Sequence, residues 1–581
     1  MKVLLVALNS KFIHSNLALR YIRAYCRDYN SMEIMEFSIN DNIDRIIGRI
    51  FLAEPDLIAF SCYIWNINEV LMVADSIKRV LKDCIIVLGG PEVSFGAADI
   101  MKDNPGIDFI VIGEGERTFR QLLDGLDNKD DFSRIKGLAY RQGDEVVVTP
   151  PQPLISDLNT IPFPYKDGFE GLENKIIYYE SSRGCPFNCQ YCLSSTFSGV
   201  RYLPLDRVKR ELELFIKAGI PQVKLVDRTF NCNPERSKQI FRTILELGGN
   251  TNFHFEMAGH LIDQEMIDIL KQAPPGLFQF EIGVQSTNPK TLDAIQRKDD
   301  FNALAEAVTQ ILAGENIHIH LDLIAGLPEE DYETFKHSFN DVYSLKPNRL
   351  QLGFLKLLKG SGLRIRADQY GYEYTQYPPY KVLKNRYISY RQLLKLELIE
   401  DLVEKYYNSH CFQHTLDYLI EEHFGDPFSF FEDFAVYWKE NNYDALSYSR
   451  IRLYEILLEY GLGLKGIDQR LLRNIMRFDW VSQAKPSRYP EGLEPKEIPG
   501  MGKAVDLFFK DEDNVLKYLP HLKDYTSRQI SRMAHIEVFE YDILEGISAG
   551  RYLPKTTYVL FDYNIDNKIF RKSRYYTITL P

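Results

Sequence analysis

The run SSRGCPFNCQYC, residues 181–192, holds three cysteines, Cys185, Cys189 and Cys192, at CxxxCxxC spacing. Three thiolates this close together can bind three irons of a cubane cluster, whereas an ordinary [4Fe–4S] site takes four cysteines. The next cysteine is Cys232, well outside the run, so the fourth iron would be open to a small-molecule ligand. Two other interpretations stay open: a zinc site, which needs a fourth ligand, or free thiols buried in a core.

The composition indicates a protein of several domains that folds in water. Its 581 residues are 45% hydrophobic and 26% charged, which is ordinary for globular proteins. Residues 1–8 are too few for a signal-peptide core and read as a β-strand, and no run approaches the roughly 18 apolar residues of a membrane helix. The eight cysteines do not form a disulfide framework. We therefore expect a cytoplasmic protein without membrane segments.

The net charge of −12 disfavours non-specific binding to nucleic acid. This charge does not exclude a local basic groove.

Residues 1–134 have the pattern of a doubly wound, Rossmann-like α/β domain. Short apolar runs that read as strands alternate with helical runs, which favours a parallel sheet covered by helices on both faces. In such sheets, ligands bind beyond the carboxyl ends of the strands. The runs that carry this prediction are residues 2–8, 57–61, 84–88 and 108–112 for strands, and 16–27 and 66–81 for helices.

The rest of the chain divides into three further parts. Residues 135–172 read as a hairpin followed by a proline-rich linker. Residues 173–364 alternate again, with six strand candidates that predict a partial (β/α)6 barrel. Residues 365–581 are predicted to be a mainly α-helical C-terminal domain with a hairpin at the end. The strand candidates of the barrel are residues 176–181, 222–227, 252–257, 278–284, 318–323 and 350–355, and the helical runs include 207–218, 234–247, 380–406 and 447–460.

Three segments in this order resemble the radical S-adenosylmethionine (SAM) superfamily. They are the cysteine run with Tyr191 before its third cysteine, the segment EIGVQS at residues 281–286, and the segment DLIAGLP at residues 322–328. The resemblance implies that the open iron binds the amino and carboxylate groups of SAM. It also implies that an electron from the cluster splits SAM into methionine and a 5′-deoxyadenosyl radical.

The same resemblance places Tyr191 near the adenine and makes strand-end polar residues candidates for contacting SAM. A buried polar residue at a strand end can equally be a structural group. The candidates are Asp227, Glu281, Gln285 and Asp322.

An α/β domain ahead of such a barrel resembles the cobalamin-dependent radical SAM class. The local sequences at residues 9–15, 89–92, 113–116 and 157–164 fit this class. The D-x-H-x-x-G motif that supplies a lower-face histidine in many cobalamin domains is absent, so the resemblance implies a cobalt without a histidine ligand. The alternative is a domain that has lost its corrinoid. The residues expected around a corrinoid are Asn9, His14, Ser61, Ile64, Gly89, Gly90, Pro91, Gly113, Glu114 and Gly115.

Within this class the commonest reaction is methylation of an unactivated carbon, and we take this reaction on a small-molecule or metabolite substrate as the leading hypothesis. It would use a [4Fe–4S] cluster, SAM, cobalamin and a flavodoxin or ferredoxin as electron donor. The alternatives are a radical rearrangement, cyclisation or bond cleavage without methylation, and a module that binds cofactors without catalysis. A further alternative is a methylthiotransferase for tRNA or protein, with a second cluster on Cys26, Cys62 and Cys84. Residues 365–581 are expected to cap the barrel.

Overall fold

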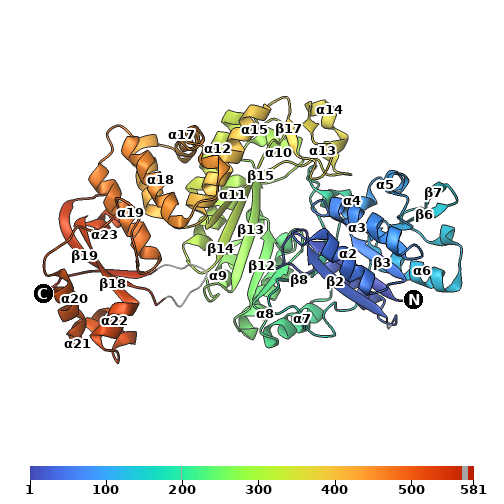
Figure 1. Ribbon diagram of the computed structural model, residues 1–581, viewed down its shortest axis with the longest axis horizontal. Helices are drawn as coiled ribbons and strands as arrows, with labels where there is room; N and C mark the ends of the chain where they lie inside the picture. The colour runs from blue at the N-terminus through green and yellow to red at the C-terminus, as the bar shows by residue number, and fades with distance from the viewer. Residues whose placement is uncertain (30, 198, 565–572) are drawn as a thin grey trace. The chain divides into compact units, whose positions relative to one another are not determined.

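The computed structural model describes residues 1–29, 31–197, 199–564 and 573–581 (Figure 1). The chain forms two compact units, which are described separately. The first comprises Met1–Ile317, Gly326–Asp331 and Phe354–Ser389, and the second comprises His318–Ala325, Tyr332–Gly353 and Tyr390–Pro581.

The first unit begins with a seven-stranded sheet in the order β2-β1-β3-β4-β5-β6-β7. The strands β1 to β5 are parallel, and the hairpin β6–β7 adds to the edge in antiparallel fashion. The strands are β1 (Val3–Asn9), β2 (Met32–Ser38), β3 (Leu57–Ser61), β4 (Ile85–Gly89), β5 (Phe109–Val111), β6 (Leu138–Gln142) and β7 (Glu145–Val148). The helices are α1 (Leu17–Tyr25), α2 (Ile43–Leu52), α3 (Ile67–Val80), α4 (Pro91–Ser94), α5 (Ala97–Asp103) and α6 (Gly115–Asn128). The predicted doubly wound α/β architecture is confirmed.

The strand β2 was not predicted, because Glu33 and Glu36 interrupt its apolar run. It forms the edge of the sheet, where β1 is its one partner among the described strands, so its burial is partial. The chain leaves β1 towards β2 on one side, while β3 lies on the other side. In open α/β sheets, such a switch point is where ligands bind.

A buried amide fixes the loops at this switch point. Asn66 is fully buried, and its Nδ2 donates to the carbonyls of Leu8 and Ser61, both at 2.9 Å. Its Oδ1 accepts from the Tyr63 amide at 2.7 Å. One side chain therefore ties the ends of β1 and β3 together.

The second half of this unit contains four parallel strands in the order β13-β12-β11-β8. They are β8 (Ile177–Tyr179), β11 (Gln222–Leu225), β12 (Asn252–Met257) and β13 (Phe278–Gln285). The accompanying helices are α7 (Leu205–Lys217), α8 (Pro234–Leu247), α9 (Gln264–Leu270), α10 (Pro289–Ala294) and α11 (Phe301–Leu312). Between β8 and α7, the strands β9 (Ser182–Cys185) and β10 (Gly199–Tyr202) form a short antiparallel hairpin.

Along β13, buried and partly buried side chains alternate. This alternation separates the core face of these strands from their polar face. Phe278, Phe280 and Ile282 are buried, and Phe278 and Phe280 pack with Phe241 of α8. The intervening residues, such as Glu281 and Gln285, point to the opposite face and are only partly buried. Functional side chains can therefore gather on that face without disturbing the core.

The last part of the first unit, Phe354–Ser389, contacts both halves of that unit. It contains α13 (Gly362–Ile365), α14 (Ala367–Tyr370), β16 (Glu373–Tyr374) and β17 (Val382–Lys384). The Leu363 amide donates to the Gln190 carbonyl at 2.8 Å, and Arg366 Nη2 donates to Gln190 Oε1 at 2.9 Å. Tyr380 donates its hydroxyl hydrogen to Glu92 of the first sheet's α4.

The prediction of a helix over residues 380–406 is wrong for its first ten residues. Tyr380 has a φ of +57°, which a right-handed helix cannot accommodate. The Val382 amide donates to the Leu355 carbonyl at 3.0 Å as part of β17. The helix begins only at Tyr390.

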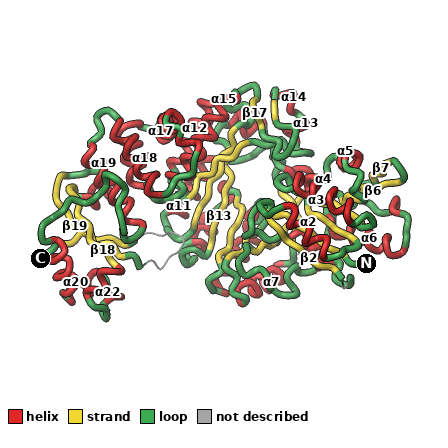
Figure 2. Tube along the Cα trace, viewed as in Figure 1, coloured by secondary structure: helices red, strands yellow, loops and turns green. Residues whose placement is uncertain are grey.

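The second unit begins with β14 (His318–Ala325), α12 (Tyr332–Ser344) and β15 (Arg349–Phe354), so the predicted alternation of six strands with helices is confirmed along the chain. From Tyr390 onwards it is mainly helical, as predicted, and Figure 2 shows these helices in red. They are α15 (Tyr390–Leu402), α16 (Gln413–Leu419), α17 (Pro427–Glu440), α18 (Arg450–Gly463), α19 (Gln469–Gln483), α20 (Met501–Lys510), α21 (Glu512–Tyr518), α22 (Ser527–Met533) and α23 (Ile543–Ala549).

A small antiparallel sheet of three strands lies near the C-terminus. It consists of β18 (Ala534–Tyr541), β19 (Pro554–Asp562) and β20 (Arg574–Ile578) in that order. The pairing of β19 with β20 confirms the predicted terminal hairpin, whereas β18 was not predicted.

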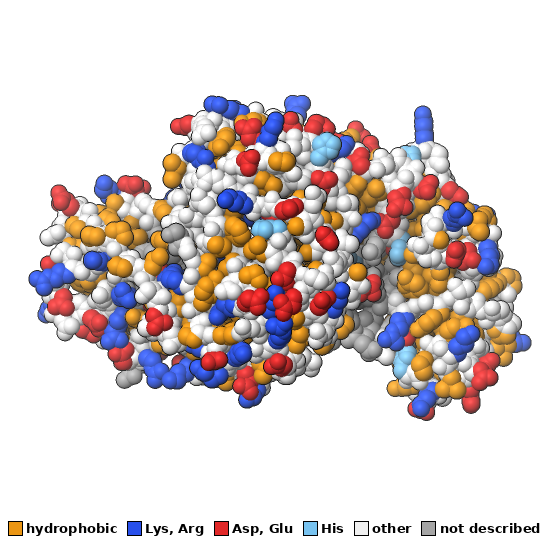
Figure 3. All heavy atoms as spheres, turned by 180° about the vertical axis from the view of Figure 1, so that it is seen from behind, with side chains coloured by type: hydrophobic (Ala, Val, Ile, Leu, Met, Phe, Trp, Pro, Cys, Tyr) orange, Lys and Arg blue, Asp and Glu red, His pale blue; other side chains and the backbone are white. Residues whose placement is uncertain are grey.

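No helix in the described part of the chain combines the length and the apolar character needed to span a membrane. On the face drawn in Figure 3, basic and acidic side chains lie interspersed.

Candidate functional site

The three cysteines lie on the β9–β10 hairpin and in the loop that it closes. Cys185 ends β9, and Cys189 and Cys192 follow in the loop. Gly184 has a φ of +109°, and a Cβ there would collide with the carbonyl oxygen of Gly199 on β10. Glycine directly before the first cysteine therefore lets the two strands approach closely enough to close the loop.

Asp227 anchors the start of this hairpin. Its carboxylate is buried and accepts hydrogen bonds from the Ser181 hydroxyl at 2.6 Å, the Ser182 hydroxyl at 2.5 Å and the Ser181 amide at 2.9 Å. Burial raises the pKa of Asp227, while these donors oppose the rise. The structure thus gives Asp227 a positioning role towards the cysteine loop; its predicted contact with SAM stays a prediction.

A buried cation lies beside the cysteines. Arg297 Nη1 is 3.3 Å from the Tyr191 hydroxyl and 3.9 Å from Cys189 Sγ. Asp299 holds this guanidinium, with Oδ2 at 2.8 Å from Nη2, and His260 Nδ1 lies 2.7 Å from Asp299 Oδ1. Burial alone would raise the pKa of Asp299, but His260 and Arg297 lower it. Arg297 was missed by the sequence reasoning, because no motif marks it.

The sulfur environment fits a cluster with three cysteine ligands. The Ser194 amide donates to Cys192 Sγ at 3.4 Å, and Cys185 Sγ is 3.5 Å from the Thr229 hydroxyl. Donors to the sulfurs are a usual means of tuning such clusters. Within the described residues, no three His, Cys, Asp or Glu side chains converge as ligands of one metal ion. A zinc site would need that convergence, whereas each cysteine of a cubane cluster binds a different iron.

Glu281 is part of a charged group on the polar face of the strands. Its Oε2 is 2.9 Å from Lys224 Nζ of β11 and 3.1 Å from His254 Nε2 of β12. The hydrogen bond from His254, together with the charge of Lys224, outweighs burial and lowers the pKa of Glu281 to about 2. The carboxylate is therefore charged at neutral pH. Lys224 and His254 were not predicted as site residues, and the predicted contact of Glu281 with SAM stays a prediction.

Among the residues predicted to contact SAM, Gln285 has a side-chain oxygen that is available to hydrogen-bond a bound molecule. It has a φ of +70°, a strained conformation for a residue with a side chain. Its Oε1 is buried and has no hydrogen-bond partner among the described residues. A buried polar atom without a partner is costly, so a polar group of a bound molecule would satisfy it. Asp322 lies on β14, in the second unit, and its role stays a prediction.

A cavity of about 630 Å³ lies at the carboxyl edge of the first sheet. It includes the β1–β3 switch point, and its lining also contains Tyr178, Glu180, Arg183 and Arg228, which belong to the second half of the unit. The structure brings nine of the ten residues predicted for a corrinoid into this lining: Asn9, His14, Ser61, Gly89, Gly90, Pro91, Gly113, Glu114 and Gly115. That they contact a corrinoid stays a prediction.

The remaining predicted residue, Ile64, is not in the cavity lining, whereas its neighbours Tyr63 and Trp65 are. The rings of Tyr63 and Trp65 stack at 4.4 Å with an interplanar angle of 4°, and Trp65 is 44% exposed. Such a flat aromatic surface suits a large planar ligand. The sequence signal for it was the aromatic pair that follows β3.

Gly90 shapes the wall of this cavity. Its φ is +119°, and a Cβ would lie 2.5 Å from the Cys62 carbonyl oxygen. The loop after β4 therefore passes over the loop after β3 at a distance that only glycine allows.

His14 contributes its imidazole to the cavity wall. Its Nδ1 is 2.7 Å from the Tyr178 hydroxyl. Burial, together with Lys11, Lys224 and Lys175, lowers the pKa of His14, so the ring is neutral at pH 7. The absence of a histidine ligand to cobalt stays a prediction.

The three N-terminal cysteines do not converge. Cys26 belongs to the core layer on one face of the first sheet, whereas Cys62 and Cys84 belong to the layer on the other face. Burial raises the pKa of Cys26 to about 12 and that of Cys84 to about 11, as expected for thiols packed in a core. The second cluster of the methylthiotransferase hypothesis therefore has no ligand set here.

In a comparison with known protein families, three family models match successive parts of the chain. Residues 3–123 match the B12 binding domain, residues 179–342 match the radical SAM superfamily, and residues 368–561 match a protein family of unknown function, DUF4080. The chain thus contains an N-terminal B12-binding domain, a radical SAM domain and a C-terminal DUF4080 region. The cofactors that these domains imply are a [4Fe–4S] cluster, SAM and cobalamin.

Among curated proteins, the cobalamin-dependent radical SAM methyltransferase TokK of Streptomyces tokunonensis is 31% identical over 341 residues, which are 55% of this chain and 50% of TokK. The chain thus spans about half the length of this relative.

Two solved structures share the fold. The radical SAM methyltransferase TsrM from Kitasatospora setae, with cobalamin and a [4Fe–4S] cluster bound, has a TM-score of 0.56 at 18% identity, over 65% of this chain and 78% of TsrM. The cobalamin-dependent SAM radical enzyme OxsB, with aqua-cobalamin and SAM bound, has a TM-score of 0.58 at 16% identity, over 82% of this chain and 78% of OxsB.

Proposed function

We propose that this protein methylates an unactivated carbon of a small-molecule substrate in a cobalamin-dependent radical SAM reaction. The observation that carries the proposal is the position of the cavity. It is lined on one side by the carboxyl edge of the first sheet. On the other side it is lined by Tyr178 of β8, Glu180 directly after β8, Arg183 of β9 and Arg228 after β11. A corrinoid in this cavity would therefore adjoin the end of the strands from which the cysteine loop starts. TokK, named as a methyltransferase, supports the same reaction class.

When bound, the three cofactors supply a carbon-centred radical and a transferable methyl group. The chain's own residues bind and orient them. Cys185, Cys189 and Cys192 hold the irons, and Arg297 keeps a fixed positive charge at their side. Gln285 Oε1 offers a buried acceptor for SAM. The cavity wall, with the stacked Tyr63–Trp65 pair, offers an aromatic surface to a flat ligand.

The electron that the reaction needs would come from a flavodoxin or ferredoxin. We place the protein in the reducing cytoplasm, and the eight free cysteines support that placement.

The test is a purification of the full chain under anaerobic conditions from cobalamin-fed cells, followed by measurement of iron and corrinoid. We expect about four irons and one corrinoid per chain. With SAM, a low-potential reductant and fractions of a metabolite extract, we expect S-adenosylhomocysteine and 5′-deoxyadenosine to form together. We also expect deuterium from methyl-labelled SAM to enter a small molecule.

Three results would defeat this proposal in different ways. Deoxyadenosine without S-adenosylhomocysteine would indicate rearrangement, cyclisation or cleavage. Four irons without corrinoid would make the first domain a structural remnant. An iron count near eight would bring back the methylthiotransferase hypothesis.

A further inference from the structure

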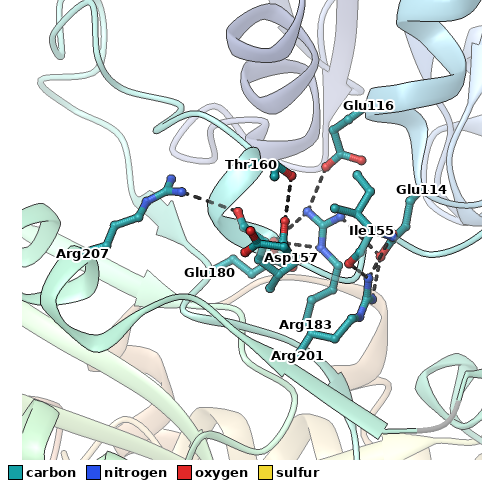
Figure 4. Close-up of polar contacts among 10 residues, drawn as sticks. Glu114, Glu116, Ile155, Asp157, Thr160, Glu180, Arg183, Arg201 and Arg207 are labelled. Carbon is teal, nitrogen blue, oxygen red and sulfur yellow. Dashed lines mark hydrogen bonds and ion pairs between the residues drawn. The ribbon is translucent and has the colours of Figure 1, made fainter.

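Two arginines of the β9–β10 hairpin reach into the first domain (Figure 4). Arg183 of β9 and Arg201 of β10 are directly paired across the hairpin, so their side chains lie on the same face. Both contact the carboxylate of Glu114: Arg201 Nη2 lies 2.6 Å from Oε1, and Arg183 Nη1 lies 3.4 Å from the same oxygen.

Arg183 also joins two further carboxylates. Its Nη2 is 2.9 Å from Glu116 Oε1 and 2.9 Å from Glu180 Oε2. Its guanidinium carbon lies 5.7 Å from the centre of the Tyr21 ring on α1. The Arg183 side chain thus contacts Tyr21 of α1, Glu116 in the first turn of α6 and Glu180 at the end of β8.

The linker between the two halves is tied into the same network. The Ile155 amide donates to Glu114 Oε2 at 2.8 Å, and Arg201 Nη1 donates to the Ile155 carbonyl at 2.7 Å. Further along the linker, Arg207 of α7 donates to the Asn159 carbonyl at 3.2 Å. Figure 4 shows Glu114 between Arg201 and Ile155.

These ion pairs are largely shielded from water. The side chains of Arg183, Glu114 and Glu116 are 16%, 14% and 5% exposed. Burial would raise the pKa of Glu114, but Arg201 and Arg183 lower it, so it is charged at neutral pH. Breaking a buried ion pair leaves an uncompensated charge and is strongly unfavourable. The loop at residues 113–116 and the hairpin are therefore expected to move together.

The ion pairs join two segments, the loop at residues 113–116 and the β9–β10 hairpin, and each segment is part of a proposed cofactor site. Gly113, Glu114 and Gly115 line the cavity at the carboxyl edge of the first sheet. Arg183 is separated from Cys185 only by Gly184.

We infer that Glu114 is a positioning residue that couples the two cofactor sites, so that a corrinoid in the cavity and a cluster on the cysteine loop each favour the binding of the other. The inference rests on the proposed function in so far as both cofactors must bind. Coupling between two sites is reciprocal, and a contiguous network of ion pairs is a physical route for it.

The experiment measures the Kd of hydroxocobalamin for the full chain with the cluster reconstituted and for the chain without the cluster. For wild type, we expect binding at least about fivefold tighter with the cluster. For Glu114→Gln, which keeps the size of the side chain and removes its charge, we expect the ratio of the two Kd values to fall towards one. The electron paramagnetic resonance (EPR) spectrum of the reduced cluster should shift on adding cobalamin in wild type and not in the variant.

The matched control is Glu36→Gln. It breaks another buried ion pair of the same domain, with Arg20 at 3.0 Å, and among the described residues this pair makes no hydrogen bond or ion pair with the hairpin. Glu36 also hydrogen-bonds Asn9 of the cavity lining. We therefore expect weaker cobalamin binding with the ratio of Kd values retained. If Glu114→Gln does not fold, Arg201→Gln removes the same contact from the hairpin side.

A wild-type ratio of one, or an equal ratio in wild type and Glu114→Gln, would overturn the coupling while leaving the proposed function standing. If no form of the chain bound cobalamin, both the proposed function and the coupling would fall.

Discussion

The charge of Arg297 should raise the reduction potential of the cluster. Arg297 Nη1 lies 3.9 Å from Cys189 Sγ, and a unit charge at this distance interacts with another by about 4 kcal/mol at an effective dielectric constant of about 20. The added electron spreads over the whole cluster, so we take about a third of this value, about 1.4 kcal/mol, which is about 60 mV for a one-electron couple. Removing the positive charge disfavours the more negative reduced state. We therefore expect Arg297→Gln to lower the midpoint potential by about 60 mV.

The assay is a redox titration of the reconstituted cluster followed by EPR. Arg297→Lys keeps the charge and should shift the potential much less. Lys298→Gln removes an exposed cation one residue away and should leave the potential nearly unchanged, because water screens it. An Arg297→Gln potential equal to that of wild type, with the cluster intact, would refute the reasoning.

Three further predictions follow from single residues. Gln285→Ala should weaken SAM binding about tenfold, because one buried hydrogen bond is worth about 1.4 kcal/mol; calorimetric titration of the cluster-loaded protein checks this, and unchanged affinity would remove Gln285 from the SAM site. Gly90→Ala should lower the free energy of unfolding by about 1–3 kcal/mol and reduce the cobalamin bound per chain, since its Cβ would lie 2.5 Å from the Cys62 carbonyl oxygen; normal cobalamin content would contradict the role given to this loop. The folded pKa of Glu281 is about 2, below its ordinary 4.5, so its ionised form stabilises the fold above pH 4.5 and this contribution is lost as the pH falls towards 2. In denaturant titrations, the stability difference between wild type and Glu281→Gln should shrink over this pH range, and a constant difference would count against the ion pairs with Lys224 and His254.

Much of the fold could be predicted from the sequence, because the period of its apolar residues is regular. The strand Asn252–Met257 and the helix Pro234–Leu247 have the bounds that were predicted. The edge strand β2 was missed, since exposure allows charged residues there. The segment at residues 380–389 was misread as a helix, because Tyr380, Leu383 and Tyr387 have helical spacing, while Tyr380 adopts a left-handed backbone.

Only those site residues that belong to a recognisable local motif could be predicted from the sequence. The cysteines and the glycine loops carry local signatures. Sequence spacing brings the three cysteines together, and the edge rule for parallel strands places the glycine loops at one edge of the first sheet. Arg297 reaches Cys189 from 108 positions along the chain, and Arg201 reaches Glu114 from 87. Such contacts depend on tertiary packing, which a single sequence does not reveal.

The bond between Gln190 and Arg366 has a consequence for the timing of synthesis. These residues are 176 positions apart, and at about 5–20 residues per second a ribosome needs about 9 to 35 seconds to make that length. Throughout this interval, the cysteine loop lacks the segment that later covers Gln190. We expect the nascent chain to be the form in which the three thiols are most exposed to oxidation and most open to iron–sulfur delivery. Arrested chains that end before Phe354 should therefore react faster with a thiol reagent at these cysteines than the finished protein does.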